Sequence, residues 1–448
     1  MARRYRIETS GCQMNFHDSE RLAGVLEQDG YEAAADGQAA DLVVINTCSV
    51  RERAEEKLHS ALGELKHAAS GDSPVTIAVT GCVAQQEGSK ILERAPFVDV
   101  VLGTQGLRQL PQLLREAAET RSAKVDTHPH DDVSFPLGVT KRADPVRAWV
   151  TIIEGCNEFC SFCVVPYTRG HERMRPVADI LAEVHEVVAS GRVEVHLLGQ
   201  IVNHYQAPDD PSCDFAELLV RVSAIPGVLR VRFASPHPRH VTPSLIAAIR
   251  DIPQVCKHLH LPVQSGSTRV LTTMRRRYSR EQYLDGIQAL TSAIPAIEFS
   301  TDIIVGFPGE SAEEFDETLD LVRRVRFQSI YSFKYSVRPN TLAEKRMRDD
   351  VPESEKTRRI VALQQLQRDI QLERHAAGVG RDVEVLVDTV SGRVDGGLGG
   401  RTAGNTVVNF DGPAAWLGQI VTVRVTRATP HGWRGEAVDA VGAALTAR

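Results

Sequence analysis

Short apolar runs alternate with longer amphipathic segments over the first 120 residues. Strands are expected at 4–12, 31–34, 41–48, 75–82 and 98–104, and helices are expected to begin near Phe16 and Arg51. Strands that are separated by helices pair in parallel, with the helices covering the faces of the sheet. The pattern therefore predicts a doubly wound parallel α/β domain over residues 1–120.

The same alternation returns after a stretch rich in Pro and Gly, residues 121–144, which is predicted to be a linker. Further strands are expected at 148–153, 193–199, 229–235, 257–263, 297–306 and 328–336, each followed by a helical or loop segment. Six such strands predict a partial (β/α)6 barrel, whose active site lies where the strands end. A polar helix over 352–375 is expected to pack on its flank, which gives a core domain over 145–377.

The pattern changes again beyond Gly378. Val and Thr alternate through residues 382–410 and 418–438, and Gly interrupts both stretches. Period-two alternation with frequent turn residues is typical of short antiparallel strands. Residues 378–448 are therefore predicted to form a small antiparallel β-barrel.

Composition narrows the class of protein. The chain has 448 residues, a formal net charge of −6 and eight cysteines. No apolar run approaches the roughly 20 residues of a membrane span, and the basic start has no apolar stretch behind it, as a signal peptide would. We therefore expect a cytoplasmic protein without a membrane partner, whose cysteines bind metal or take part in catalysis more readily than they form disulfides.

Three of these cysteines lie in one loop, "CNEFCSFC" at 156–163, with the spacing C-x3-C-x2-C. Structural zinc takes four ligands, and the nearest histidine, His171, is eight residues away. Iron-sulfur clusters also bind thiolates, and an iron that lacks one is open to another ligand. The spacing is the signature of radical S-adenosylmethionine (SAM) enzymes, which this loop resembles. Buried structural thiols and an incidental zinc loop are the alternatives.

Another three cysteines end predicted strands of the first domain, in the contexts "SGC", "NTC" and "TGC": Cys12, Cys48 and Cys82. Because ligands bind outside the carboxyl ends of strands in open α/β sheets, these thiols are expected to converge on one point. The alternative is that all three are buried core thiols. Cys213 and Cys256 are predicted to be ordinary thiols.

Two glycine-containing loops follow barrel strands. Gly306 and Gly309 lie in "TDIIVGFPGES", and Gln264 and Ser265 lie in "LPVQSGS". Glycine lets a backbone approach a ligand closely. Each loop is a candidate contact for the adenosine or methionine part of SAM.

Arginines provide candidate contacts to RNA. The segment 269–280 carries five and no Asp or Glu: Arg269, Arg275, Arg276, Arg277 and Arg280. Clustered arginines bind phosphate and give salt-dependent affinity for nucleic acid, although most charge runs are solvated helix faces. In the C-terminal barrel, Arg401 and Asn405 of "GRTAGN" are candidates as well, with a simple turn as the alternative.

With both cysteine triads, the chain resembles radical SAM methylthiotransferases nearly from end to end. That family combines an N-terminal cluster domain, a radical SAM core and a C-terminal TRAM barrel, which binds RNA. The segments "GCQMNFHDSE", "NTCSVRERAEEK", "TGCVAQQEG" and "GCNEFCSFCVVPYTRGHERMRP" are similar to those of the MiaB-type tRNA-2-methylthio-N6-dimethylallyladenosine synthases. Three positions depart from the usual residues of that subfamily: Met174, Ile201 and Asn340.

The resemblance implies an enzyme that methylthiolates carbon 2 of N6-isopentenyladenosine next to the anticodon in tRNA. It implies two 4Fe-4S clusters, one held by Cys156, Cys160 and Cys163 with an iron open to SAM, the other held by Cys12, Cys48 and Cys82 as the sulfur carrier. SAM is then both radical source and methyl donor, and the enzyme needs an electron donor protein and a sulfur source. Alternatives are a methylthiotransferase for another modified tRNA adenosine or a ribosomal protein side chain, and a non-catalytic iron-sulfur protein that binds RNA or transfers electrons.

Overall fold

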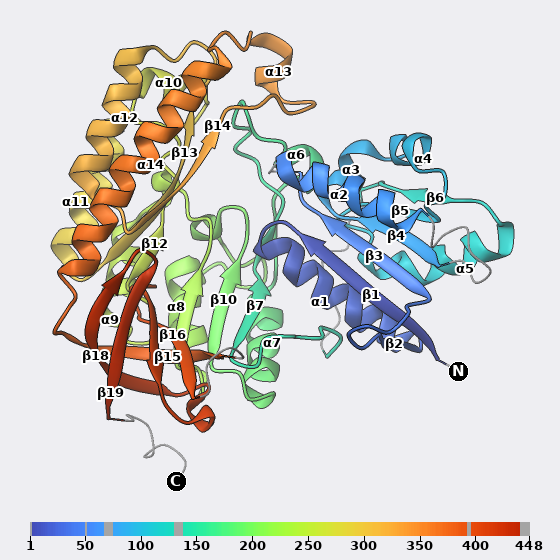
Figure 1. Cartoon of the computed structure of the whole chain (residues 1–448), viewed down its shortest axis with the longest axis horizontal. Helices are drawn as coiled ribbons and strands as arrows, with labels where there is room; N and C mark the ends of the chain where they lie inside the picture. The colour runs from blue at the N-terminus through green and yellow to red at the C-terminus, as the bar shows by residue number, and fades with distance from the viewer. Residues whose placement is uncertain (1, 50–51, 67–74, 130–137, 392–395, 440–448) are drawn as a thin grey trace. The chain divides into compact units, whose positions relative to one another are not determined.

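The computed structural model describes residues 2–49, 52–66, 75–129, 138–391 and 396–439 and is drawn in Figure 1. The chain divides into two compact units. Unit 1 comprises residues 1–143, 149–175 and 338–345, and unit 2 comprises 144–148, 176–337 and 346–448. The cysteine loop at 156–163 therefore belongs to the same unit as the N-terminal domain.

A six-stranded parallel sheet forms the centre of unit 1, in the order β2-β1-β3-β4-β5-β6. Its elements are β1 (Arg3–Ser10), α1 (Gln13–Gln28), β2 (Tyr31–Ala33), β3 (Leu42–Thr47), α2 (Glu52–Leu65), β4 (Thr76–Thr80), α3 (Cys82–Glu87), α4 (Lys90–Arg94), β5 (Val100–Leu102), α5 (Leu110–Thr120) and β6 (Lys124–Asp126). The doubly wound parallel α/β prediction is confirmed.

Both faces of this sheet are covered, which explains why its central strand β3 is buried at every position. Val44 belongs to a core with Leu22 and Leu26 of α1 and with apolar residues of α5. Its neighbour Val43 points to the other face and packs in a second core with residues of α2, α3 and α4. Because successive side chains alternate between faces, a strand in such a sheet reads as one continuous apolar run.

Strand β6 lies inside the stretch that the sequence predicts to be a linker. It pairs in parallel with β5, from Val100 and Lys124 to Leu102 and Asp126. A three-residue strand at a sheet edge has too short an apolar pattern to be recognised in the sequence. Residues 130–137 of the same stretch lie outside the described residues, and the domain boundaries stay predictions.

The segment with the three-cysteine loop completes unit 1. Strand β8 (Ile153–Glu154) pairs antiparallel with β9 (Arg173–Met174), and the chain between them contains the loop and the short helix α6 (Val165–Thr168). The loop also contacts helix α13 (Leu342–Arg346), because the amide of Ala343 donates to the carbonyl of Ser161 at 2.8 Å. A small hairpin thus carries the cysteines.

Unit 2 alternates strands and helices as predicted, and the partial barrel is confirmed. Strand β7 (Arg147–Thr151), whose first residues belong to this unit, precedes β10 (Glu194–Leu198), β11 (Arg230–Phe233), β12 (His258–His260), β13 (Glu298–Val305) and β14 (Ser329–Lys334). The helices are α7 (Val177–Ala189), α8 (Phe215–Ser223), α9 (Pro243–Asp251), α10 (Thr268–Thr273), α11 (Arg280–Ala293), α12 (Ala312–Val325) and α14 (Glu353–Ala376). Strands β10 and β11 pair in parallel, as do β12, β13 and β14.

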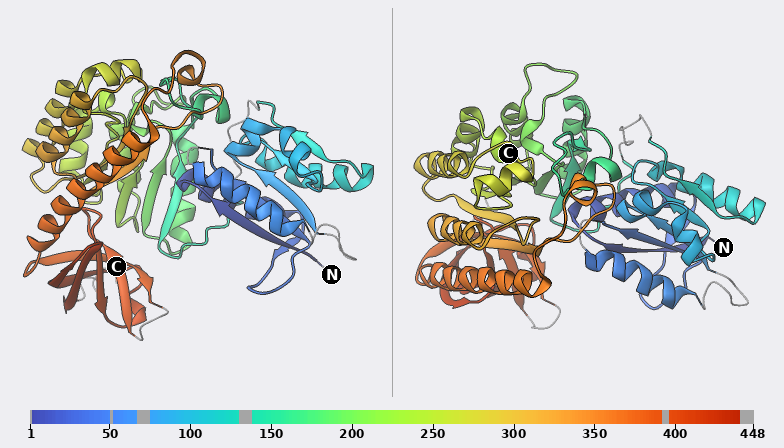
Figure 2. Two further views of the ribbon diagram at one scale, coloured as in Figure 1. Left: turned by 45° about the horizontal axis from the view of Figure 1, so that its top comes forward. Right: turned by 90° about the horizontal axis from the view of Figure 1, so that it is seen from above.

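The C-terminal part is a closed antiparallel barrel, as predicted, with the order β15-β16-β17-β19-β18. Its strands are β15 (Asp382–Val390), β16 (Gly397–Arg401), β17 (Val407–Asp411), β18 (Ile420–Thr429) and β19 (Gly432–Asp439). Inward-facing Val385, Leu398, Phe410 and Val423 share one core. One short parallel pairing, between β17 and β19, closes the barrel. Helix α14 leads directly into it (Figure 2).

Buried arginines join this barrel to the amino ends of the parallel strands of unit 2. Arg230, at the start of β11, donates to the carbonyl of Arg401, and Arg232 donates to the carbonyl of Thr402 at 2.8 Å. Gln328, just before β14, donates to the Thr406 hydroxyl at 2.8 Å. The β16–β17 turn is therefore fixed at the end of the strands opposite to their carboxyl ends.

Candidate metal centres and nucleic-acid surface

The N-terminal triad lies at the carboxyl ends of three adjacent strands. Cys12 follows β1 and precedes α1, Cys48 follows β3, and Cys82 begins α3 directly after β4. Because β1, β3 and β4 are neighbours in the sheet, their ends bring the three thiols together. Cys48 forms side-chain hydrogen bonds with both Cys12 and Cys82. The predicted convergence is thus present in the structure.

Two glycines make this convergence possible. Gly81 has a φ of +95°, and a Cβ at this position would lie 2.4 Å from Oδ1 of Asn46. Gly11 precedes Cys12 in the same way, and a Cβ there would lie 2.5 Å from Cβ of Cys48. Any larger residue would collide with its neighbours, which accounts for the "GC" pairs in the sequence.

Cys48 and Cys82 are buried, Cys12 is half-buried, and the three thiols differ in acidity. The hydrogen bond to Cys48 lowers the pKa of Cys12 to about 6 and that of Cys82 to about 7, in each case against the effect of burial. The same hydrogen bonds, together with burial, raise the pKa of Cys48. The positive charge of Arg169 also lowers the pKa of Cys12 and Cys82. Thiolates, the form that binds metal, are therefore favoured at two of the three positions.

The second triad lies in the tight loop 155–163. Gly155 has a φ of +74°, and a Cβ there would lie 2.0 Å from the carbonyl oxygen of His171. Two hydrogen bonds hold the loop. The amide of Cys156 donates to the carbonyl of Gly170 at 3.1 Å, and the amide of Cys163 donates to the carbonyl of Cys160 at 3.0 Å. Burial is the main cause that raises the pKa of Cys156 to about 11, and the nearby Cys160 adds to it.

The two donor sets fit clusters better than single ions. Within the described ranges, no group of three or more His, Cys, Asp or Glu side chains is arranged to hold one metal ion. A 4Fe-4S cluster makes no such demand, because each of its thiolates binds a different iron. Tetrahedral zinc would need a fourth ligand, and Nδ1 of His171 lies 3.0 Å from the Asn157 side chain. Three thiols without a fourth partner suit a cluster with one open iron.

The predicted SAM-contacting loops are neighbours at the ends of barrel strands. Gln264 has a φ of +72°, and its backbone pairs with β13 through the amide of Ile304 at 2.9 Å. Ser265 is fully buried. Gly306 follows β13 with a φ of +69°, and a Cβ there would lie 2.4 Å from the Lys356 side chain. Gly309 donates its amide to Asp350 at 2.7 Å. Their contact with SAM stays a prediction.

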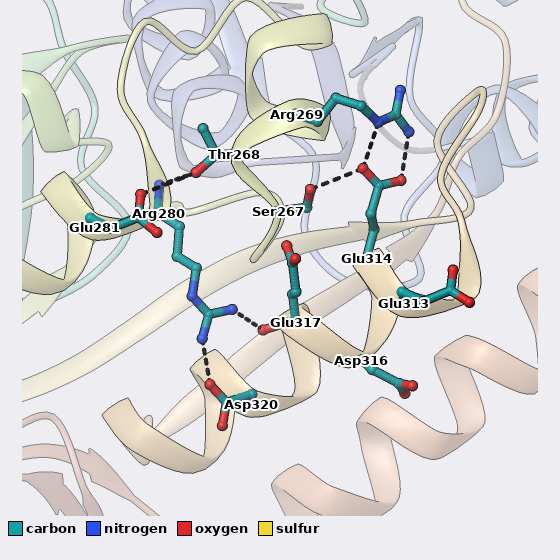
Figure 3. Close-up of a pocket in the computed structure, with 10 residues that line it drawn as sticks. All are labelled: Ser267, Thr268, Arg269, Arg280, Glu281, Glu313, Glu314, Asp316, Glu317 and Asp320. Carbon is teal, nitrogen blue, oxygen red and sulfur yellow. Dashed lines mark hydrogen bonds and ion pairs between the residues drawn. The ribbon is translucent and has the colours of Figure 1, made fainter.

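The five arginines of 269–280 separate into three groups. Arg269 binds Glu314 through two nitrogens, at 2.6 and 2.5 Å, and Arg280 pairs with Asp320 (Figure 3). Both line a 680 Å³ pocket with mostly acidic walls. Arg276 is buried and donates to Pro262 at 3.1 Å. The remaining two, Arg275 and Arg277, are exposed.

Histidines at the barrel strand ends were not predicted from the sequence. The rings of His204 and His240, which follow β10 and β11, stack at 4.4 Å, and His237 packs edge-on against Tyr278 at 5.5 Å. Arg277 lies close enough to His237 to act on its pKa. Exposed Arg277 thus lies beside aromatic rings, a combination that suits RNA. A single histidine outside any motif does not reveal from the sequence that it lies at a strand end.

Arg401 is the last residue of β16, and Asn405 lies in the turn between β16 and β17. Arg401 forms an ion pair with Asp388 at 2.5 Å. Asn405 has a φ of +71°, and its amide donates to the carbonyl of Thr402 at 2.9 Å, which closes the turn. Asn405 therefore forms a turn, which the sequence left as the alternative to RNA contact. RNA contact by Arg401 and Asn405 stays a prediction.

The three departures from the usual family residues are structurally mild. Asn340 has a φ of +69°, a conformation that suits glycine but that asparagine also adopts. Ile201 is buried after β10, and Met174 lies half-buried in β9. None of these positions is one of the six predicted cluster cysteines.

Three family models match successive parts of the chain. Residues 4–103 match "Uncharacterized protein family UPF0004", residues 150–322 match the radical SAM superfamily, and residues 377–438 match the TRAM domain. No helix among the described residues is long and apolar enough to cross a membrane.

Solved structures share the fold at low identity. The radical SAM methyltransferase TsrM from Kitasatospora setae has a TM-score of 0.55 and 14% identity, with 77% of each chain covered. The cobalamin-dependent SAM radical enzyme OxsB has a TM-score of 0.53 and 13% identity over 82% of this chain and 56% of that one. This likeness shows the fold alone.

Curated relatives are similar over nearly their whole length. The tRNA-2-methylthio-N(6)-dimethylallyladenosine synthase of Acidothermus cellulolyticus is 48% identical over 96% of this chain and 87% of that protein. The enzyme of the same name from Geobacter metallireducens is 44% identical over 96% and 97%. The resemblance seen in the sequence is therefore confirmed, and the chain belongs to the tRNA-2-methylthio-N(6)-dimethylallyladenosine synthase family of radical SAM methylthiotransferases.

Proposed function

We propose that this chain replaces the hydrogen on carbon 2 of N6-isopentenyladenosine, next to the anticodon in tRNA, with a methylthio group. Near full-length identity to the named synthases supports the proposal. The observation that carries it is the presence of two three-cysteine sites in one compact unit. An ordinary radical SAM enzyme needs one such site, whereas an enzyme that also inserts sulfur has a use for a second.

The radical SAM family implies a 4Fe-4S cluster and SAM. Cys156, Cys160 and Cys163 would hold that cluster, and the loops around Gln264, Ser265, Gly306 and Gly309 would contact SAM. With these groups bound, the site supplies a 5′-deoxyadenosyl radical able to break an unactivated C–H bond. The protein's share is to orient the substrate carbon and exclude water. Burial of Cys156 and Cys160 suits that task.

A second cluster, held by Cys12, Cys48 and Cys82, would carry the sulfur. Support comes from the low pKa of Cys12 and Cys82, which favours thiolate ligands, and from the convergence of all three thiols. An electron donor protein and a sulfur source complete the reaction as partners. Anaerobically reconstituted protein should contain about eight irons per chain, and about four would contradict the second cluster.

For the tRNA, the exposed Arg275 and Arg277 are the strongest candidates among the predicted contacts. Arg277 lies near His237 at the strand ends, where the substrate of a barrel enzyme binds, and Arg275 is two residues before Arg277. Arg276 would support them from the interior. Arg401 and Asn405 would act from the TRAM barrel.

The decisive experiment is nucleoside mass spectrometry of tRNA from cells with and without the chain. Methylthiolated isopentenyladenosine should appear only in cells with an intact chain, and Cys48→Ala should abolish it. Cys256→Ala is the matched control, because Cys256 is equally buried but lies in the barrel, outside both triads. Methylthiolation of another adenosine, or of a ribosomal protein in a parallel digest, would replace the proposed substrate with that one.

A further inference from the structure

The segment that follows the radical SAM cysteines also contacts the N-terminal site. Helix α6 packs against α3, whose first residue is Cys82. The hydroxyl of Thr104 donates to the carbonyl of Thr168 at 2.6 Å, and the side-chain amide of Gln105 donates to the main-chain carbonyl of Arg169 at 3.0 Å. The next carbonyl, of Gly170, accepts the amide of Cys156. The six residues 165–170 thus hold one triad directly and touch the strand-end region of the other.

Arg169 is the residue of this segment whose side chain reaches helix α1, which begins directly after Cys12. Its side chain is only 6% exposed, and its guanidinium donates to Asp18 of α1 at 2.7 Å. Asp18 lies six residues after Cys12, within the helix that Cys12 precedes. A buried ion pair therefore fixes the cation beside the helix start and the thiols.

Further cations surround Arg169, although Arg21 among them pairs with Glu154 at 3.0 Å. Burial lowers the pKa of the fully buried His17, and four arginines add to that effect: Arg21, Arg142, Arg175 and Arg169. Burial alone would lower the pKa of Arg169, yet Asp18, Cys82 and Cys12 hold it well above its ordinary value. Buried cations require compensating negative charge. Thiolates bound to a cluster would supply it.

We propose that Arg169 is a positioning and charge-compensating residue for the N-terminal cysteine site, delivered there by the segment that also fixes the radical SAM cysteine loop. The inference rests on the proposed function, because it assumes a cluster on Cys12, Cys48 and Cys82. Its consequence is that the two sites are not independent: the backbone that holds one also sets the charge around the other. A cation close to a cluster stabilises the reduced form, which carries one more negative charge, and so raises the reduction potential.

The test uses the full chain with Cys156, Cys160 and Cys163 replaced by Ala, so that only the N-terminal cluster is present. In this background, Arg169→Gln should shift the midpoint potential to more negative values, while Arg169→Lys should keep it close to the parent. Arg115→Gln is the matched control. It removes an arginine that pairs with Asp29 at 2.6 Å at the far end of the same helix α1, and it should leave the potential unchanged.

Potential and iron content are measured together by dye titration with electron paramagnetic resonance and by iron analysis. Arg169→Gln with full iron content and an unchanged potential would overturn the inference. A parent without iron would overturn the second cluster of the proposed function and this inference with it. If Arg169→Gln does not fold, because it leaves Asp18 buried without its partner, the neutral pair R169Q/D18N takes its place. It should still shift the potential downwards, because Arg169 acts on Cys82 more strongly than Asp18 does.

Discussion

Replacing Arg275 and Arg277 together with Gln should weaken tRNA binding and reduce its dependence on salt. Both side chains are exposed, and each follows a residue whose side chain anchors the turn from inside: Met274 is fully buried, and Arg276 is 7% exposed. Arg269 and Arg280 belong to the same sequence run, but their charge is already neutralised by Glu314 and Asp320. We therefore expect the exposed Arg275 and Arg277 to be the two cations of this run that contribute most to the salt dependence.

The size of the effect follows from that number. Each phosphate neutralised by a cation contributes about 0.7 (single strand) to about 0.9 (duplex) to the slope of log affinity against log salt. Two cations should therefore change the slope by about 1.4 to about 1.8. Between about 50 and about 200 mM salt, the wild type should lose roughly tenfold more affinity than the variant.

Binding of unmodified tRNA is measured by fluorescence anisotropy at several salt concentrations. The variant R269Q/R280Q is the control: it removes the same formal charge from the same run, and its slope should equal that of the wild type. The reasoning is refuted if R275Q/R277Q keeps the wild-type slope, or if the control loses as much as the test variant. Circular dichroism of both variants verifies that the turn and helix α11 are retained.

Three further outcomes are expected. Cys160→Ala and Cys48→Ala should each retain about four of about eight irons. Cys160→Ala should form no 5′-deoxyadenosine. Cys48→Ala should still cleave SAM reductively but form no methylthiolated tRNA. Gly306→Ala should cost about 1 to 3 kcal/mol in urea unfolding, because the new Cβ meets Lys356 at 2.4 Å and the φ of +69° disfavours a side chain; Gly286→Ala, with no atom within 4 Å, should not destabilise. Burial, aided by Arg276, lowers the pKa of His237 to about 2, so the unfolded chain binds the extra proton. As the pH is lowered below about 6.5, the free energy of unfolding should therefore decrease, by up to about 1.4 kcal/mol per pH unit from this residue. The variant His237→Asn should show a flatter pH profile, and an unchanged profile would contradict it.

The cysteine sites could be predicted because their signal is local. Each of Cys12, Cys48 and Cys82 comes at the end of an apolar strand, two of them directly after Gly, and the parallel sheet then brings the three strand ends together. The C-x3-C-x2-C spacing carries its information in eight residues. Strand β6 was missed for the opposite reason, because three residues carry too little pattern.

The charges could not be predicted in the same way. Arg269 and Arg280 look free in the sequence, since their partners Glu314 and Asp320 lie 45 and 40 positions further along the chain. Arg169 shows the same limit, because Asp18 and Cys12 both lie more than 150 positions earlier in the chain. Pairings of this kind come from packing, which no window of sequence records.

Hydrogen bonds connect β11 to the C-terminal barrel, so deleting the TRAM barrel would disturb the rest of unit 2. Arg230 and Arg232 are 4% and 8% exposed and direct their guanidinium groups at main-chain oxygens of residues 401–403. A shortened protein that ends before Gly378 would present these cations to solvent beside a newly bared apolar surface. The TRAM barrel is thus a structural support of the catalytic barrel and not only a separable RNA-binding domain. If the truncated protein loses activity, the loss could therefore reflect a destabilised catalytic barrel as much as a lower affinity for tRNA.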